Sequence, residues 1–252
     1  MRDPDPAPRH IWLTVGQFAA TLAIVLLAKI VAAEAFYVPS GSMQPTLLIG
    51  DELAVTKFPY GYSRYSLPIA IGPALPQRLL GRLPARGDVV VFRLPSDPSQ
   101  TYVKRVVGLP GDRVQMRNGR LWINGQELPL RRVGFGEVEN EGGGAVRAAR
   151  YIETLPGGRE HPLYKLSRYG ELDDTDVFDV TPGHLFVMGD NRDNSADSRL
   201  SPAAGGVGLL PVENLVGRVE AVIGSWDLAA AREPVWMWPS ALRWSRFFSR
   251  VN

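Results

Sequence analysis

The distribution of hydrophobic and polar positions separates a short N-terminal segment from the rest of the chain. Residues 11–28 contain no charged side chain, and the apolar run continues to Ala33 with only Lys29 inside it. As a helix, residues 11–33 would be about 35 Å long at ~1.5 Å per residue, enough to cross a hydrocarbon layer of ~30 Å. We therefore predict a transmembrane anchor over residues 11–33, preceded by a tail of residues 1–10.

The flanking charges predict how this anchor is oriented. Arg2 and Arg9 precede it, whereas the next basic residue after Lys29 is Lys57. Because basic residues stay on the cytoplasmic side, we expect the N-terminus in the cytoplasm and the rest of the chain outside. The alternative is a cleaved signal peptide, since residues 33–35 offer an A-x-A site. The apolar stretch is longer than the roughly 7–15 residues usual for such peptides, which favours the anchor.

Beyond the anchor, apolar and polar positions alternate in short runs rich in β-branched residues, which indicates β-strands. The runs that fit this pattern are Glu52–Thr56, Asp88–Leu94, Thr101–Val107, Arg113–Met116, Arg120–Ile123, His184–Met188 and Val216–Ser225. Asn118-Gly119 lies between two of these runs and predicts a tight hairpin. We interpret residues 60–86 as an extended, partly apolar excursion, and residues 134–160, with their two glycine clusters, as an insertion with flexible loops.

The composition fits a chain of short strands and many turns. Its 252 residues include 26 glycines and 21 prolines, scattered helix breakers that disfavour an all-helical fold. Cysteine is absent, which excludes disulfides, thiolate zinc sites and a cysteine nucleophile, and three histidines speak against a multi-histidine metal site. The net charge of +2 gives no argument for binding nucleic acid.

The C-terminus mixes aromatic and basic side chains. These residues are Trp236, Trp238, Trp244, Phe247 and Phe248, together with Arg243, Arg246 and Arg250. Such a mixture suits a surface that lies on lipid headgroups. The alternative is a terminal helix packed on the domain.

A serine pair follows the anchor directly. Ser40-Gly41-Ser42 stands between Pro39 and Pro45. Glycine between two serines permits a tight bend and the close approach of a substrate backbone. A serine acts as a nucleophile only with a base that takes its proton, and on its own the segment has the composition of an ordinary turn.

A lysine in a predicted strand is the leading candidate for that base. Lys104 shares a strand face with Tyr102 and Val106. Desolvation there would lower its pKa from ~10.4, by up to ~3–5 units on full burial, and make neutral amine available near neutral pH. The alternative is an edge lysine that blunts strand pairing. The chain has no G-x-S-x-G motif, and His184 lies in an apolar run where a structural role is expected.

A third segment, Met188–Arg199, concentrates polar side chains after an apolar strand. It holds three aspartates, two arginines, two asparagines and two serines, a density that indicates a rigid hydrogen-bonded loop. A calcium loop is disfavoured. With Asp190 in the first position, Arg192 would occupy the third and Ser201 the twelfth, where a glutamate is required.

Taken in order, these segments resemble the sequence boxes of bacterial signal peptidase I, a family of Ser/Lys serine proteases. The boxes are Pro39–Met43, Tyr102–Arg105 with Gly108–Asp112, and Gly189–Arg199. The resemblance is close over residues 36–58, 86–116 and 183–226 and loose over 60–86 and 117–182. Some members of the family have two membrane spans before the catalytic domain, whereas one is predicted here. Some members also carry a disulfide, and this chain has no cysteine.

The resemblance implies a role for each matching position. It makes Ser42 the nucleophile and Lys104 the general base, with the Ser40 hydroxyl and the Ser42 N–H as the oxyanion hole. Ser195 would hydrogen-bond the Lys104 amine and orient it. The residues that brace the surrounding loop would be Asp190, Arg192, Asp197, Arg199 and Arg105, and the pockets for small substrate side chains would be lined by Phe36, Val38 and Val103.

The resemblance also implies a mostly β fold, with an antiparallel catalytic core of residues 34–116 and 183–252 and a variable β domain of residues 117–182 inserted into it. The expected enzyme is a membrane-anchored serine endopeptidase on the outer, periplasmic face of the cytoplasmic membrane. It would remove signal peptides from exported pre-proteins after small residues in an A-x-A pattern, without metal or cofactor. Its expected partners are these pre-proteins and membrane lipid, not nucleic acid. The alternatives are a specialised Ser/Lys maturation peptidase, for instance for a conjugative pilus subunit, and a non-catalytic, membrane-anchored β scaffold.

Overall fold

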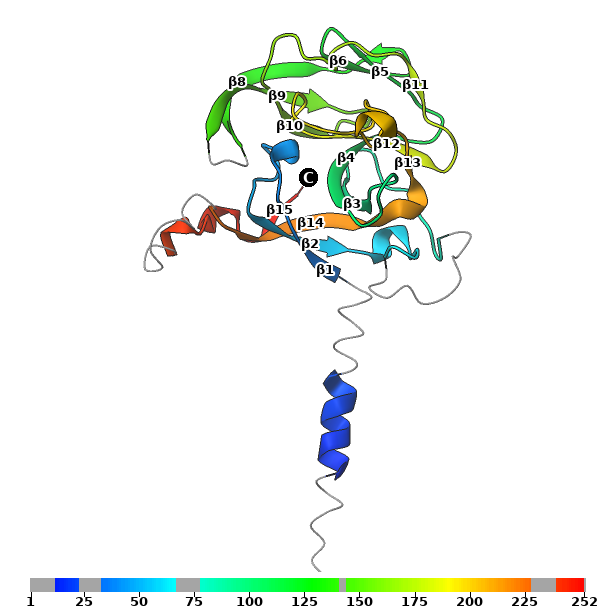
Figure 1. Ribbon diagram of the computed structural model, residues 1–252, viewed down its shortest axis with the longest axis vertical. Helices are drawn as coiled ribbons and strands as arrows, with labels where there is room; N and C mark the ends of the chain where they lie inside the picture. The colour runs from blue at the N-terminus through cyan, green and yellow to red at the C-terminus, as the bar shows by residue number, and fades with distance from the viewer. Residues whose placement is uncertain (1–11, 23–32, 67–77, 141–143, 228–238, 252) are drawn as a thin grey trace, which may run out of the picture.

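The computed structural model describes residues 12–22, 33–66, 78–140, 144–227 and 239–251. Residues 12–22 form a helix, and the rest of the described chain is mostly antiparallel β-structure (Figure 1). Within these ranges, no helix has both the length and the apolar character needed to span a membrane. Of the predicted anchor, residues 11 and 23–32 lie outside the described part of the chain.

The largest sheet has eight antiparallel strands and is strongly curled (Figure 1). Its strand order is β1-β2-β14-β3-β4-β12-β13, and β15 pairs with β14 beside this path. The strands are β1 (Ala33–Tyr37), β2 (Asp51–Thr56), β3 (Val89–Arg93), β4 (Thr101–Gly108), β12 (His184–Met188), β13 (Leu210–Pro211), β14 (Leu215–Ser225) and β15 (Ser249–Arg250).

The described chain also forms two smaller antiparallel sheets. One has the order β10-β9-β8, and the other has the order β11-β5-β6-β7. Their strands are β5 (Arg113–Arg117), β6 (Arg120–Ile123), β7 (Gln126–Glu127), β8 (Leu130–Glu139), β9 (Ala145–Thr154), β10 (Glu160–Lys165) and β11 (Phe178–Asp179). Short 3-10 helices connect the strands: η1 (Gly41–Met43), η2 (Phe58–Tyr60), η3 (Pro202–Ala204), η4 (Val212–Asn214) and η7 (Trp244–Arg246).

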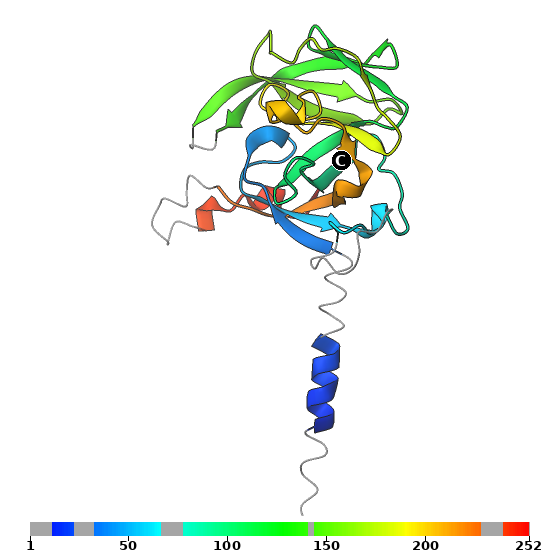
Figure 2. The ribbon, with the colours of Figure 1, turned by 45° about the vertical axis from the view of Figure 1, so that its right-hand side comes forward.

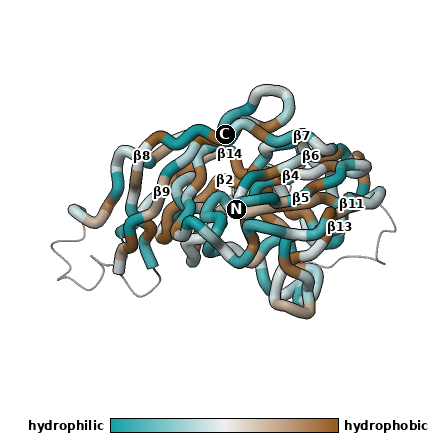
Figure 3. Tube along the Cα trace, turned by 90° about the horizontal axis from the view of Figure 1, so that it is seen from above, coloured by the Kyte–Doolittle hydropathy of each residue, from teal (hydrophilic) through white to brown (hydrophobic). Residues whose placement is uncertain are grey.

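The curl of the large sheet buries β3 on both of its faces. Val89 and Val91 pack into one hydrophobic cluster with Leu53 and Val219, whereas Val90 and Phe92 pack into a second. A strand covered on both sides needs a continuous apolar run, which Val-Val-Val-Phe supplies. Other strands interleave hydrophobic with hydrophilic positions (Figure 3), as expected where one face meets solvent.

All seven predicted strands are present, with ends within two residues of those observed. The predicted hairpin is also confirmed, because β5 and β6 pair up to Arg117 opposite Arg120. Asn118 and Gly119 have φ angles of 50° and 71°. Asparagine and glycine are the residues that tolerate this left-handed conformation best.

The interpretation of residues 134–160 as flexible loops is wrong. Most of this segment belongs to β8 and β9, which pair along their whole length. Charged side chains interrupt the apolar alternation of both strands, namely the exposed Arg131 and Arg132 in β8 and the buried Glu153 in β9, so the pattern did not show them. The terminal-helix alternative is also corrected: residues 244–246 form a single 3-10 turn, and Ser249–Arg250 pairs with β14. Trp236 and Trp238 lie outside the described residues.

In the excursion of residues 60–86, Tyr62 and Leu79 form an antiparallel bridge. Residues 67–77 lie outside the described chain. The β5–β6 hairpin crosses the expected boundary between residues 116 and 117, and the division into core and inserted domain stays a prediction.

The three-stranded sheet contributes directly to the region of the polar loop. Strand β10 lies at its edge, and Tyr164 in β10 forms a parallel bridge with Asn191. The Tyr164 N–H donates to the Asp190 carbonyl at 2.9 Å, and its carbonyl accepts from the Arg192 N–H at 3.0 Å. The polar loop is thereby attached to a sheet edge.

Candidate active site

Ser42 lies in the one-turn helix η1, between β1 and β2. Ser40 precedes the turn in an extended conformation, and the Gln44 N–H closes it by donating to the Gly41 carbonyl at 3.2 Å. Met43 is buried in the same hydrophobic cluster as Leu53 and Val219. Because this neighbour is fixed in the core, the turn presents Ser42 in a defined direction.

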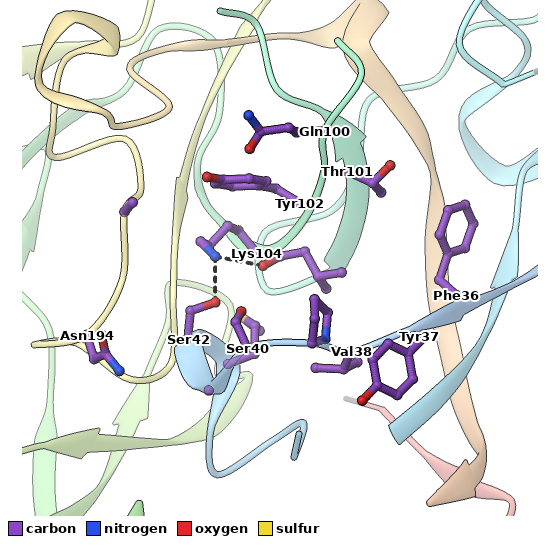
Figure 4. Close-up of a pocket in the computed structure, with 15 residues that line it drawn as sticks. Phe36, Tyr37, Val38, Ser40, Ser42, Gln100, Thr101, Tyr102, Lys104 and Asn194 are labelled. Atoms are coloured by element: carbon purple, nitrogen blue, oxygen red, sulfur yellow. Dashed lines mark hydrogen bonds between the residues drawn. The ribbon is translucent and has the colours of Figure 1, made fainter. Parts of the chain in front are cut away.

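Lys104 lies in β4, an interior strand between β3 and β12. Its side chain is 3% exposed, and its Nζ lies 2.7 Å from the Ser42 Oγ and 3.1 Å from the Val103 carbonyl (Figure 4). The Lys104 Nζ faces the Tyr102 ring and lies 5.3 Å from the ring centroid. The edge-lysine alternative is therefore wrong, because this strand has a hydrogen-bonded neighbour on each side.

The surroundings of the amine weaken its hold on a proton. Burial lowers the pKa of Lys104 from 10.5 to about 8, with a smaller contribution in the same direction from Arg199. The carboxylates of Asp197 and Asp190 oppose this shift. At a pKa of about 8, roughly one amine in ten is neutral at pH 7, which suits a general base.

A cavity of about 590 Å³ opens beside these two side chains. The predicted pocket residues Phe36, Val38 and Val103 all line it, as do Ser40 and Ser42. In Figure 4, Phe36, Tyr37 and Val38 lie to one side of the Ser42–Lys104 pair and Asn194 lies to the other. An extended peptide bound here could therefore place side chains on both sides of Ser42.

Arg105, the neighbour of Lys104, points to the other face of β4 and forms a buried ion pair with Asp190. Its Nε donates to Asp190 Oδ1 at 2.9 Å, and its Nη2 donates to Oδ2 at 2.8 Å. Burial alone would raise the pKa of Asp190, but the Arg105 guanidinium holds it below the usual value. Asp190 also accepts from the Thr46 hydroxyl, so one carboxylate connects β4, the polar loop and the segment after Ser42.

A second buried ion pair closes the polar loop on itself. Arg199 donates to both oxygens of Asp197, at 2.9 and 2.8 Å. Asp197 also accepts from the Gly189 N–H at 3.0 Å, and Arg199 donates to the Arg192 carbonyl at 2.7 Å. These bonds make residues 189–199 the rigid loop that its composition predicts.

Two expected contacts differ in the structure. The amine of Lys104 is directed at Ser42 and the Val103 carbonyl, and it makes no hydrogen bond to Ser195. Ser195 Oγ is buried and has no hydrogen-bond partner among the described residues. Arg192 does not brace the loop from within: its guanidinium pairs with both carboxylate oxygens of Glu153 in β9.

The sequence did not reveal how strongly the three-stranded sheet holds this loop. Besides Glu153, this sheet provides two more side chains near the loop: Lys165, which pairs with Asp193, and His161. His161 is buried against Glu153 and Asp190, and burial lowers its pKa to about 4, so the imidazole is neutral. Glu153, His161 and Lys165 lie far along the chain from their partners in the loop, so no local sequence signal connects them with it.

The described residues contain no cluster of three or more histidine, aspartate or glutamate side chains that could hold a metal ion. The side chains that line the cavity include the Ser42 hydroxyl and the Lys104 amine.

Comparisons with known proteins place the chain in a family. Residues 11–226 match a family described as "Signal peptidase, peptidase S26". A signal peptidase I of Rickettsia rickettsii is 37% identical over 258 residues, which cover 94% of this chain and 91% of the relative. That of Rickettsia prowazekii is 36% identical over 269 residues, 99% of this chain and 97% of the relative. A crystal structure of a signal peptidase I from Enterococcus faecalis, 27% identical, covers 54% of this chain and 97% of its own with a TM-score of 0.32.

Proposed function

Because this chain belongs to the signal peptidase family, peptidase S26, we propose that it is a membrane-anchored endopeptidase that removes signal peptides from exported pre-proteins with a Ser42–Lys104 dyad. The observation that carries the proposal is the 2.7 Å distance between the Ser42 hydroxyl and a buried amine whose pKa is lowered to about 8. Family membership supports a serine endopeptidase, and the geometry supports this pair of residues as its reacting groups.

The reaction begins with proton transfer. Neutral Lys104 takes the proton of Ser42 as Oγ attacks the carbonyl carbon after a small side chain of the precursor. The Ser42 N–H and the Ser40 hydroxyl stabilise the oxyanion that forms, and one such donor contributes about 2.7–4 kcal/mol. The Lys104 ammonium then gives its proton to the leaving amine, which frees the C-terminal product and leaves an ester on Ser42.

Deacylation uses the same amine again. Lys104, neutral once more, removes a proton from a water molecule that attacks the ester carbonyl, and the proton passes to the departing Ser42 oxygen. The hydrogen-bonded loop of residues 189–199 keeps Asp190 and Asp197 at fixed places around the amine. Each of these groups is held by buried ion pairs, so little reorganisation accompanies the proton transfers.

The cavity supports selectivity for small residues. Phe36, Val38 and Val103 line it, and side chains larger than alanine would collide with such walls in shallow pockets. We therefore propose cleavage after A-x-A sequences, with specificity arising by exclusion. The same geometry would serve a specialised maturation peptidase, and the choice of precursor separates the two.

The anchor completes the proposal. Residues 11–33 would cross the cytoplasmic membrane with the N-terminus inside, which places Ser42 about nine residues beyond the bilayer on the periplasmic face. Signal-peptide cleavage sites also emerge at this surface, so anchoring would bring enzyme and substrate together. The exposed Trp244 and Phe248 suit contact with the same lipid surface.

The test is cleavage of a secretory precursor with an A-x-A site by the purified protein in detergent, with N-terminal sequencing of the product. Ser42→Ala and Lys104→Met should abolish cleavage, and Lys104→Arg should fail because a guanidinium does not give up its proton. Ser245→Ala, a change at an exposed serine outside the cavity, is the matched control and should keep full activity. Cleavage by any of the first three variants would refute the dyad.

A further inference from the structure

The residue two positions after the proposed nucleophile is a completely buried glutamine. Gln44 is 0% exposed, and its amide pairs with the backbone of Glu139 at the end of β8. Its Nε2 donates to the Glu139 carbonyl at 3.1 Å, and the Glu139 N–H donates to its Oε1 at 3.0 Å. The side chain thus satisfies both backbone groups of Glu139, as a neighbouring strand would.

This pair of bonds lies directly against the turn that carries Ser42. A Cβ placed on Gly41 would lie 2.9 Å from the Gln44 Nε2 and 3.1 Å from the Glu139 carbonyl oxygen, so only glycine fits here without displacement. Asn191 holds the turn at two other points: its Nδ2 donates to the Gly41 carbonyl at 3.1 Å and its N–H donates to the Ser42 carbonyl at 3.0 Å. In Figures 1 and 2, the blue turn accordingly lies between the green β8–β10 sheet and the orange β14.

The partner of Gln44 is itself held in place. The Arg243 Nη2 lies 3.0 Å from each carboxylate oxygen of Glu139, and its Nη1 donates to the Ile49 carbonyl at 2.8 Å. Glu139 is therefore connected to the C-terminal segment and to the chain leading into β2. Because Arg243 holds Glu139 in place, the hydrogen bonds from the Gln44 side chain to the Glu139 backbone also fix the position of the Ser42 turn.

We propose, on the basis of the function proposed above, that Gln44 is a positioning residue for the peptidase. By fastening the Ser42 turn to the end of β8, its amide keeps Ser42 Oγ within reach of Lys104 Nζ. The β8–β9 hairpin is on this account part of the machinery that sets the reacting distance. A displacement of about 1 Å in such a geometry can lower the rate on the order of 10²-fold.

The experiment replaces Gln44 with methionine, which has the same length but cannot form either bond. We expect Gln44→Met to lower kcat on the order of 10²-fold with KM within about twofold of the wild-type value. The acid limb of the pH profile should stay where it is, because burial of Lys104 is not altered. The matched control is Gln115→Met in β5. It removes the hydrogen bond that the Gln115 side-chain amide donates to the Thr175 carbonyl, away from the cavity. It should lower the melting temperature without changing kcat.

A second variant guards against loss of folding. Gln44→Leu also removes both hydrogen bonds without burying a charge, so its kcat should likewise fall on the order of 10²-fold, and the melting temperatures of both variants show whether they remain folded. A kcat within about twofold of wild type for either variant, at temperatures well below melting, would show that the amide serves stability alone and would overturn the proposal. If the wild-type protein fails to cleave the precursor, or Ser42→Ala cleaves it, the proposed function falls, a result distinct from a change confined to Gln44.

Discussion

The proposed role of Lys104 as a base depends on surroundings that disfavour the charged form of its amine. Burial supplies most of this effect, and the nearby carboxylates of Asp190 and Asp197 limit it, so the pKa falls to about 8 and no further. Those carboxylates are each committed to an arginine, Arg105 or Arg199. Pairing leaves them less able to stabilise an ammonium ion than two free carboxylates would be.

Gly189 offers a test of how closely the residues around the dyad are packed. A Cβ at this position would lie 2.3 Å from the Ser195 Oγ and 2.5 Å from the Ser42 carbonyl oxygen. Gly189→Ala must therefore shift either Ser195 or the nucleophile turn, and we expect kcat to fall on the order of 10²-fold. Steady-state kinetics on the precursor would measure this. Gly144→Ala, at an exposed glycine whose Cβ would meet open space and whose φ is not in the left-handed region, controls for the substitution, and near-normal kcat in Gly189→Ala would show that the loop yields freely.

At the scale of elements, β4 performs two tasks because successive side chains point to opposite faces. Lys104 points to the cavity and Arg105 to the buried Asp190. This division could be predicted from sequence, because a strand pattern and its two faces are local properties. The same holds for the hairpin of β5 and β6, where Asn118-Gly119 specifies the turn.

The support supplied by β8–β10 could not be predicted in this way. Gln44 meets Glu139 across 95 residues, and Arg192 meets Glu153 across 39. Neither pair leaves a periodic trace in the chain. The bond expected between Ser195 and Lys104 rested on resemblance, whereas in the structure the amine contacts the Ser42 hydroxyl and the Val103 carbonyl.

The packing of β8 against β10 is testable at a single glycine. A Cβ on Gly136 would lie 2.1 Å from the Tyr164 hydroxyl and 2.7 Å from the adjacent ring carbon. We expect Gly136→Ala to destabilise the fold by about 1–3 kcal/mol, the usual range for overpacking, as measured by denaturant unfolding. Adding Tyr164→Phe removes the closest atom and should restore part of the loss. If the single variant is as stable as the wild type, the two strands are not in this contact.

At the scale of the whole molecule, burial of the Lys104 amine in the proposed dyad lowers the folding stability. The unfolded chain holds the Lys104 proton up to about pH 10.4, whereas the folded chain releases it at about 8. Unfolding therefore takes up a proton between these pH values, and stability rises with pH across this window. Below pH 8 the wild type carries the full penalty of about 3 kcal/mol, at ~1.36 kcal/mol per pKa unit.

Lys104→Met should therefore be inactive and yet more stable than the wild type at pH 7, because methionine is buried without this penalty. The difference in unfolding free energy should shrink as the pH rises from about 8 to 10.4, where both chains bury an uncharged side chain. Urea unfolding of the two proteins side by side at pH 7, 8, 9 and 10 measures it. A difference that does not change with pH would mean that Lys104 titrates normally in the folded protein.

The proposed mechanism requires that the amine of Lys104 lose its proton near neutral pH while lying against the Ser42 hydroxyl. Titration of that amine, followed by NMR of protein labelled at its four lysines, tests this most directly, with Lys104→Met identifying the signal. We expect a midpoint near pH 8, matched by a rise in kcat/KM over the same range. A midpoint near pH 10.4 would contradict it, because an amine that keeps its proton at neutral pH cannot take one from serine.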